Sequence, residues 1–183
     1  DDYRARFPLS EQRYARARTT MVDGGQHTLR LYEPFPVHIR SASGAYVDDL
    51  DGHHILDFWQ GHFANILGHN PPQIAVPLSE MLAEGYGLQT GMVDDLAFDL
   101  ASIICRQTGA DRVRFTTSGS LATMYAIMLS RSTTGRSLVL KMGGGWHGAQ
   151  PWGLIGVGYG EQGYRGYDSE GLPYATLNEV FVT

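Results

Sequence analysis

The sequence predicts an α/β fold, because strand-like segments alternate with segments of helical spacing. Residues 112–116 alternate as in a strand, residues 121–132 resemble a helix, and the apolar run 137–142 is typical of a buried strand. Small and hydroxyl-bearing residues separate the first strand from the helix. With 183 residues, the chain can hold a domain with a substantial core.

The earlier part of the chain is predicted to hold a hairpin and three helices. Residues 46–58 alternate around Asp51-Gly52, which is a strong hairpin signal. The helices are expected from residue 2 to 18, from Pro71-Pro72 to Gly85 and Gly87, and from Asp94-Asp95 to Gly109.

The composition and net charge limit the classes of protein to which the chain can belong. The chain is 43% apolar and 18% charged, which is typical of a globular protein, and it has no apolar run long enough to span a bilayer. A net charge of -5 argues against nucleic acid as a partner. The lone Cys105 lies in an apolar run and is interpreted as a core thiol. We expect a cytoplasmic protein without a disulfide framework.

The turn Ser118-Gly119-Ser120 carries the strongest functional signal. A strand that leads through these residues into a helix leaves free N–H groups and two hydroxyls at the positive end of the helix dipole. This arrangement favours a phosphate site. An ordinary helix cap, with Ser120 as the capping residue and Gly119 easing the turn, explains the same residues.

A glycine-rich segment follows the next predicted strand. Gly143, Gly144 and Gly145 allow close backbone approach, and they precede Trp146-His147-Gly148. A tryptophan between glycines can serve as a flat platform, although a core tryptophan in a flexible turn remains the alternative. A phosphate turn and an aromatic platform together fit pyridoxal phosphate, a planar phosphorylated cofactor.

These motifs resemble the class III pyridoxal-phosphate-dependent aminotransferases, especially glutamate-1-semialdehyde 2,1-aminomutase-like proteins. The resemblance is carried by Ser118 to Thr123, Thr134-Gly135-Arg136, Lys141 to Gly148, Gly44 to His53, Asp57-Phe58 and Gly68-His69-Asn70-Pro71. It implies the N-terminal portion of a fold-type-I (aspartate aminotransferase-like) transferase, a three-layer α/β/α fold with an incomplete large domain. Residues 1–70 would form an N-terminal segment with a β-hairpin, part of the small domain. Residues 71–183 would form the N-terminal half of the cofactor-binding large domain.

The resemblance also implies site residues. Ser118, Gly119, Ser120, Trp146 and His147 would bind pyridoxal 5'-phosphate. His27 and His62 would contact the substrate, at positions where relatives carry an arginine for the substrate carboxylate and a tyrosine or tryptophan. Other departures from the family pattern are Thr117, Leu121 and Gly144. The spacing of four histidines between residues 52 and 70 does not indicate a metal site, and we expect none.

The only lysine, Lys141, matches a strand-end lysine of the family and not the one that holds the cofactor covalently. In the family that lysine, and the acid that pairs with the pyridine nitrogen, lie further downstream. We therefore expect the N-terminal part of a longer enzyme that transfers an amino group on an amino acid or amino aldehyde. This segment would contain no catalytic residue and would be inactive alone.

We expect a homodimer that acts on small-molecule amino donors and acceptors. The glycine- and tyrosine-rich residues 153–171 are predicted to form a mobile loop, which gates the site in aminomutase-like relatives, although plain surface explains them equally. Two alternatives remain open. One is a phosphosugar- or nucleotide-binding α/β domain, and the other is a non-catalytic dimerisation fragment with an incomplete cofactor site.

Overall fold

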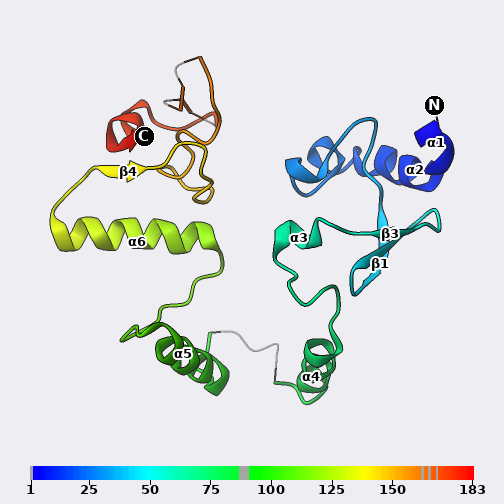
Figure 1. Cartoon of the computed structure of the whole chain (residues 1–183), viewed down its shortest axis with the longest axis horizontal. Helices are drawn as coiled ribbons and strands as arrows, with labels where there is room; N and C mark the ends of the chain where they lie inside the picture. The colour runs from blue at the N-terminus through cyan, green and yellow to red at the C-terminus, as the bar shows by residue number, and fades with distance from the viewer. Residues whose placement is uncertain (1, 87–90, 162, 165, 168) are drawn as a thin grey trace. The chain divides into compact units, whose positions relative to one another are not determined.

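The computed structural model describes residues 2–86, 91–161, 163–164, 166–167 and 169–183. The chain divides into two compact units, Asp1–Met92 and Val93–Thr183 (Figure 1). Both contain helices and strands, in keeping with the predicted α/β class. The expected division after residue 70 concerns the domains of a longer enzyme, and it stays a prediction.

The first unit begins with α1 (Asp2–Arg6) and α2 (Pro8–Ala17). The prediction of a single helix over residues 2–18 was therefore wrong, because the helix is interrupted at Phe7. The residue before a proline is driven out of the helical region, and Phe7 accordingly has φ -125° and ψ 48°. The carboxylate of Asp51 accepts hydrogen bonds from the backbone N–H groups of Leu9 (2.7 Å) and Ser10 (3.1 Å) and from the Ser10 hydroxyl (2.8 Å). A residue of the β-hairpin thus caps α2.

An antiparallel sheet of β1 (Ile39–Ser43), β2 (Tyr46–Asp49) and β3 (His54–Leu56) follows, in the order β1-β2-β3. The predicted hairpin is confirmed, with Val47 opposite Ile55. Strand β1 was missed because its sequence, Ile-Arg-Ser-Ala-Ser, lacks an apolar alternation.

An aromatic cluster forms the core of this unit. Phe35 is 1% exposed, and its ring centroid lies 5.0 Å from that of Tyr3, whose hydroxyl donates to the Phe35 carbonyl at 2.9 Å. Phe7 lies 4.8 Å from both Tyr3 and His53. The remaining elements are η1 (Val22–Gly24), η2 (Thr28–Arg30), α3 (Gln60–Phe63) and α4 (Pro72–Ala83). Helix α4 confirms the helix expected after Pro71; Gly85 follows it at φ 78°, and Gly87 lies outside the described residues.

The second unit contains α5 (Asp95–Thr108), α6 (Gly119–Thr134), β4 (Val139–Lys141), η3 (Tyr174–Glu179) and β5 (Val180–Val182). Strands β4 and β5 pair in parallel. The predicted limits of α5 are confirmed, because the Asp94 carboxylate accepts from the Ala97 N–H and Gly109 ends the helix at φ 74°. Helix α6 and strand β4 confirm the later elements with slightly different bounds.

The strand predicted over residues 112–116 is absent from the second unit. A strand forms only where a neighbouring strand accepts and donates its backbone hydrogen bonds. None of the described segments pairs with these residues. The alternating sequence alone was therefore not sufficient.

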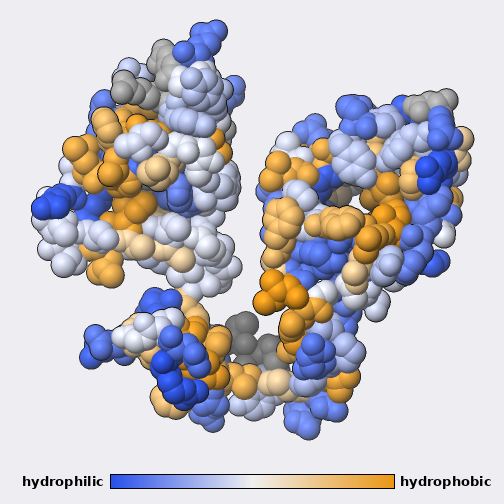
Figure 2. Space-filling view, viewed as in Figure 1, coloured by the Kyte–Doolittle hydropathy of each residue, from blue (hydrophilic) through white to orange (hydrophobic). Residues whose placement is uncertain are grey.

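Both units leave large apolar side chains exposed, as the orange surface in Figure 2 shows. The examples with the largest exposed fractions are Val93, Ile66, Val22, Phe58, Tyr159 and Tyr174. Exposed apolar surface on this scale is unusual for an isolated globular domain. In the described part of the chain, no helix is both long and apolar enough to cross a membrane.

A candidate cofactor turn and a candidate substrate cluster

The candidate cofactor turn lies at the start of α6. Ser118 has extended backbone (φ -157°, ψ 157°), and its hydroxyl oxygen accepts from the Leu121 N–H at 3.3 Å. Ser118, and not Ser120, is therefore the helix cap, which corrects the assignment made in the alternative reading of the turn. Because α6 begins at Gly119, the N–H groups of its first turn have no carbonyl partner within the helix.

Gly119 faces open space. A Cβ atom built on this residue would meet no heavy atom within 4 Å. The backbone conformation is helical and needs no glycine, so the fold itself does not require one here. The missing side chain leaves room directly beside the unpaired N–H groups.

The glycine-rich segment 143–148 packs against this same turn. The Ser120 hydroxyl oxygen accepts from the Ala149 N–H at 2.9 Å, and the Thr123 hydroxyl donates to the His147 carbonyl at 2.8 Å. Gly148 has φ 99°, and a Cβ atom on it would lie 2.7 Å from the Ser120 Cα. The structure thus brings the turn 118–120 and the segment at His147 together.

Trp146 and His147 present different surfaces. Trp146 is 60% exposed, so the alternative of a core tryptophan is wrong for this structure. The His147 ring folds back over Gly145, where its Cε1 lies 2.5 Å from the position of a Cβ atom. This contact favours a turn-stabilising role for the His147 ring, and its predicted cofactor contact stays a prediction.

The residues present fit the phosphate and the ring of pyridoxal phosphate. A phosphate needs hydrogen-bond donors and space, which the α6 N-terminus, the Ser120 hydroxyl and the open position at Gly119 provide. The ring needs an exposed flat partner, which Trp146 offers.

Lys141 has a structural place, as predicted. It is 6% exposed, and its ammonium donates to the carbonyls of Gly153 (2.7 Å) and Ile155 (2.5 Å). These bonds hold the beginning of the glycine-rich loop against β4. A lysine engaged in this way is not presented for covalent attachment of a cofactor.

A three-residue cluster missed by the sequence reasoning ties α6 to η3. The Glu179 carboxylate accepts from the indole N–H of Trp152 (2.7 Å) and from Arg131 (3.1 Å). The Arg131 guanidinium lies 4.4 Å from the centroid of the Trp152 ring. The Trp152 and Arg131 hydrogen bonds lower the pKa of Glu179 against the opposing effect of burial. No sequence spacing signals this cluster, because its members are 21 to 48 residues apart.

The predicted substrate residues His27 and His62 lie together in the first unit. Their ring centroids are 5.9 Å apart in an edge-to-face arrangement. The His27 Nδ1 accepts from the Leu29 N–H at 3.2 Å, so its Nε2 carries the proton in the neutral ring. The sequence reasoning missed Trp59, which lies edge-on to His62 at 4.6 Å.

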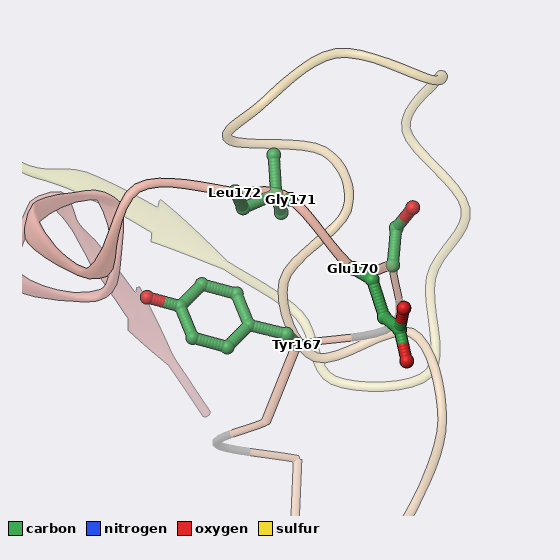
Figure 3. Close-up of a pocket in the computed structure, with 5 residues that line it drawn as sticks. Tyr167, Glu170, Gly171 and Leu172 are labelled. Carbon is green, nitrogen blue, oxygen red and sulfur yellow. The ribbon is translucent and has the colours of Figure 1, made fainter.

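The loop 153–171 has no helix or strand in its described residues, and its strand-like pairing there is limited to isolated bridges. Residues Tyr167, Ser169, Glu170, Gly171 and Leu172 line a hollow in it (Figure 3). Its polar groups do not converge, because the Tyr167 hydroxyl donates to the Pro173 carbonyl and points away from Glu170. This hollow contains none of the predicted site residues, and the mobility and gating role of the loop stay predictions.

Metal binding has no support in the geometry. Across the described ranges, no three His, Cys, Asp or Glu side chains are grouped to hold a metal ion.

The α/β elements and the turn at the start of α6 are compatible with a pyridoxal-phosphate-dependent transferase. The sequence profile of the class-III aminotransferases matches residues 29–169. The chain belongs to the class III aminotransferase family.

The curated relatives that match this chain are longer than it is. Glutamate-1-semialdehyde 2,1-aminomutase from Thermoplasma acidophilum is 32% identical over 174 residues, which cover 94% of this chain and 41% of that protein. The corresponding enzyme from Methanothrix thermoacetophila is 32% identical over 176 residues, covering 94% and 40%. The chain thus spans about two fifths of the length of these relatives.

Solved structures have the same fold. An omega-transaminase from Sphaerobacter thermophilus matches with a TM-score of 0.86 and 30% identity, over 94% of this chain and 41% of its own. A glutamate-1-semialdehyde aminomutase from Pseudomonas aeruginosa PAO1 matches with a TM-score of 0.85 and 21% identity, over 99% and 40%. The fold is that of the N-terminal part of fold-type-I transferases, as predicted.

Proposed function

We propose that this chain is the N-terminal part of a pyridoxal-phosphate-dependent aminotransferase or aminomutase that acts on an amino acid or amino aldehyde. The observation that supports this most is the start of α6. There, unpaired N–H groups, the Ser120 hydroxyl and the space at Gly119 converge beside the segment that carries Trp146. The relatives named above carry out this type of chemistry.

Each of these residues has a separate task in the proposal. The first-turn N–H groups and the Ser120 hydroxyl bind the cofactor phosphate, and Ser118 holds the helix start in place. Gly119 leaves the space that the phosphate fills. Trp146 covers one face of the ring and excludes water from it. When bound, pyridoxal phosphate supplies the electron-accepting ring that amino-group transfer requires.

The substrate is proposed to meet His27 and His62. An imidazole N–H can donate to a carboxylate or carbonyl oxygen, and the Nε2 of His27 carries such a proton. Lys141 has no part in the chemistry, because its ammonium is committed to two carbonyls. The segment alone is therefore proposed to be inactive.

We further propose a homodimer in the cytoplasm. The exposed apolar side chains of both units favour contact with further protein, and a second copy can supply part of it. Light scattering at micromolar concentration tests this point, since a monodisperse monomer of the full-length protein would contradict it.

The function is tested by cofactor absorbance. The full-length protein should bind pyridoxal phosphate with a visible absorption band that changes when an amino acid donor is added. Adenosine monophosphate and glucose 6-phosphate, as probes of the nucleotide and phosphosugar alternatives, should not compete at equal concentration. A protein that binds either probe more tightly than pyridoxal phosphate would contradict the proposal.

A further inference from the structure

The segment Gln60–Phe63, which is labelled α3 in Figure 1 and is here called the left-handed turn, has an unusual backbone. Its four residues have φ values of 43°, 60°, 62° and 63°, and only Gly61 is a glycine. A left-handed conformation costs an L-residue about 1–2 kcal/mol. Three such residues within one four-residue segment persist only where surrounding contacts enforce the conformation, and such sites concentrate where function needs a fixed geometry.

The Asp57 carboxylate supplies the first of these contacts. Its Oδ1 accepts from the Trp59 N–H at 2.8 Å, and its Oδ2 accepts from the Gln60 N–H at 3.1 Å. The Gln60 side-chain amide returns a hydrogen bond to the Asp57 carbonyl at 2.9 Å. Asp57 therefore holds the start of the turn through both its carboxylate and its backbone carbonyl.

His69 supplies the second contact. Its Nε2 lies 2.7 Å from the Asp57 Oδ2, and both side chains are about five-sixths buried, at 16% and 17% exposed. The Asn65 side-chain amide donates to the His69 Nδ1 at 3.2 Å, so the Nε2 carries the proton that Asp57 accepts. The hydrogen bonds to Asp57 outweigh the effect of its burial and lower its pKa.

His69 is itself anchored to the sheet. Its backbone exchanges two hydrogen bonds with Gly44, at 2.8 and 2.9 Å, in the tight connection between β1 and β2. Close approach is required there, because a Cβ on Gly68 would lie 2.8 Å from the Gly44 carbonyl oxygen. The chain of contacts therefore runs from the sheet through His69 and Asp57 to the turn.

The turn carries one member of the candidate substrate cluster, which consists of His27, Trp59 and His62. It carries His62, whose ring meets Trp59 on one side and His27 on another, and these rings are exposed. An unfolded turn would leave His62 free to rotate away from His27. The strain is thus localised where the proposed substrate residues must keep a fixed separation.

We infer that Asp57 and His69 are positioning residues, which hold the left-handed turn so that His62 stays against His27 for contact with the substrate. This inference rests on the proposed function for the identity of the bound molecule. The turn and its anchoring are properties of the first unit alone.

The test uses the full-length protein labelled with fluorotryptophan, in which the Trp59 fluorine signal is assigned by Trp59→Phe. A His62→Ala variant gives the signal of a Trp59 without its imidazole neighbour. Asp57→Ala and His69→Leu should move the Trp59 signal toward that reference. His69→Gln, which keeps an N–H donor, should stay near the wild-type signal.

The matched control is Asp48→Ala. It breaks another His–Asp contact of 2.7 Å, between His54 and Asp48 on the β2–β3 hairpin, away from the turn. This variant should leave the Trp59 signal unchanged. A comparable movement in the control would show that the signal follows general loosening, and it would overturn the inference.

Kinetics supply the second measurement. Asp57→Ala and His69→Leu should raise KM for the amino donor about tenfold, the loss expected from one misplaced hydrogen bond, with kcat within about twofold. Pyridoxal phosphate content should not change. His69→Gln should restore KM toward the wild-type value.

Three results would overturn the inference: a Trp59 signal that stays in place in both breaking variants, a His69→Gln variant that behaves like His69→Leu, or a moved signal with unchanged KM. Failure of the proposed function is distinguishable from these. A wild-type protein that binds no pyridoxal phosphate would reject the function, while the Trp59 signal would still decide whether Asp57 and His69 hold the turn.

Discussion

The start of α6 is capped by a residue that is local in the sequence, although residues 147–149 also pack against it, whereas the left-handed turn is anchored through a residue twelve positions away. Ser118 caps α6 through the N–H group three residues later. Asp57 is held by His69, twelve residues away, and His69 by Gly44 on the sheet. The first region has open donors in an ordinary backbone conformation, and the second has a strained backbone held by side-chain hydrogen bonds.

A candidate binding surface can therefore be prepared in two ways. A helix N-terminus attracts an anion through properties that every helix has, so its geometry needs little support. A left-handed turn of mostly L-residues depends on the surrounding contacts for its existence. Substitutions should therefore affect the α6 turn by filling space and the left-handed turn by removing its anchors.

The largest expected effect comes from filling space beside α6. Gly148→Val introduces both a left-handed β-branched residue and an overlap with the Ser120 backbone. We expect a loss of about 3–5 kcal/mol in the free energy of unfolding. Denaturant titration measures it, and pyridoxal phosphate binding should fail as well.

The matched control for this prediction is Gly109→Val. Gly109 also has a positive φ, of 74°, but a Cβ on it meets open space. Its cost should be limited to the backbone strain of about 1–2 kcal/mol. Equal losses in the two variants would show that the close approach at Gly148 is unimportant.

A somewhat smaller effect is expected at Lys141. Lys141→Met keeps the length of the side chain but leaves the carbonyls of Gly153 and Ile155 without their donor. Unfolding free energy should fall by about 2–3 kcal/mol, the cost of buried carbonyls that lose their hydrogen bonds. Lys141→Arg is the milder comparison. Cofactor attachment in the full-length protein should survive in Lys141→Met, and loss of covalent attachment in an otherwise folded variant would contradict the structural role.

Asp51 is a second long-range anchor in the first unit, because it caps α2 from more than 40 residues away. Asp51→Ala removes three hydrogen bonds from the start of α2. The expected cost is about 1–2 kcal/mol, as for the loss of a helix cap. Glu80→Ala, which changes an exposed carboxylate on α4 of the same unit, should cost much less.

The lowered pKa of Asp51 predicts that the stability of the fold depends on pH. Burial opposes ionisation of Asp51, but hydrogen bonds from Leu9 and Ser10 outweigh it, and its pKa in the folded chain is lowered. The carboxylate therefore stabilises the fold above its unfolded pKa, and this contribution is lost as the pH falls through the lower folded pKa. Thermal unfolding across the acid range should show a steeper loss of stability for the wild type than for Asp51→Ala. Parallel curves would contradict this account.

Much of the fold could be predicted because its signals are local. Asp94 and Gly109 mark the ends of α5 within the helix's own sequence, and Asp51-Gly52 marks the hairpin. The strand expected over residues 112–116 failed because strand formation depends on a partner that no local pattern specifies. The break at Pro8 carried a local signal that was overlooked.

The candidate site divides in the same way. Ser118, Gly119 and Ser120 were found from sequence because a helix start has recognisable residues. His27 and His62 were named only from family positions, and the contact between their rings was not predicted, since 35 residues separate them. The anchoring by Asp57 and His69 was missed, because a hydrogen bond between side chains twelve residues apart leaves no periodic pattern. Gly61 was the one local sign of a left-handed turn.

The start of α6 is proposed to bind the phosphate of the cofactor. The decisive measurement compares the full-length protein with its Gly119→Val and Ser120→Ala variants in their affinities for pyridoxal phosphate and for pyridoxal, which lacks the phosphate. Gly119→Val should fold normally, since its side chain enters open space, but it should lose the preference for pyridoxal phosphate. Ser120→Ala should bind pyridoxal phosphate about tenfold more weakly, or somewhat more, and bind pyridoxal unchanged. Equal affinity of all three proteins for pyridoxal phosphate would show that the Ser-Gly-Ser turn is only a helix cap.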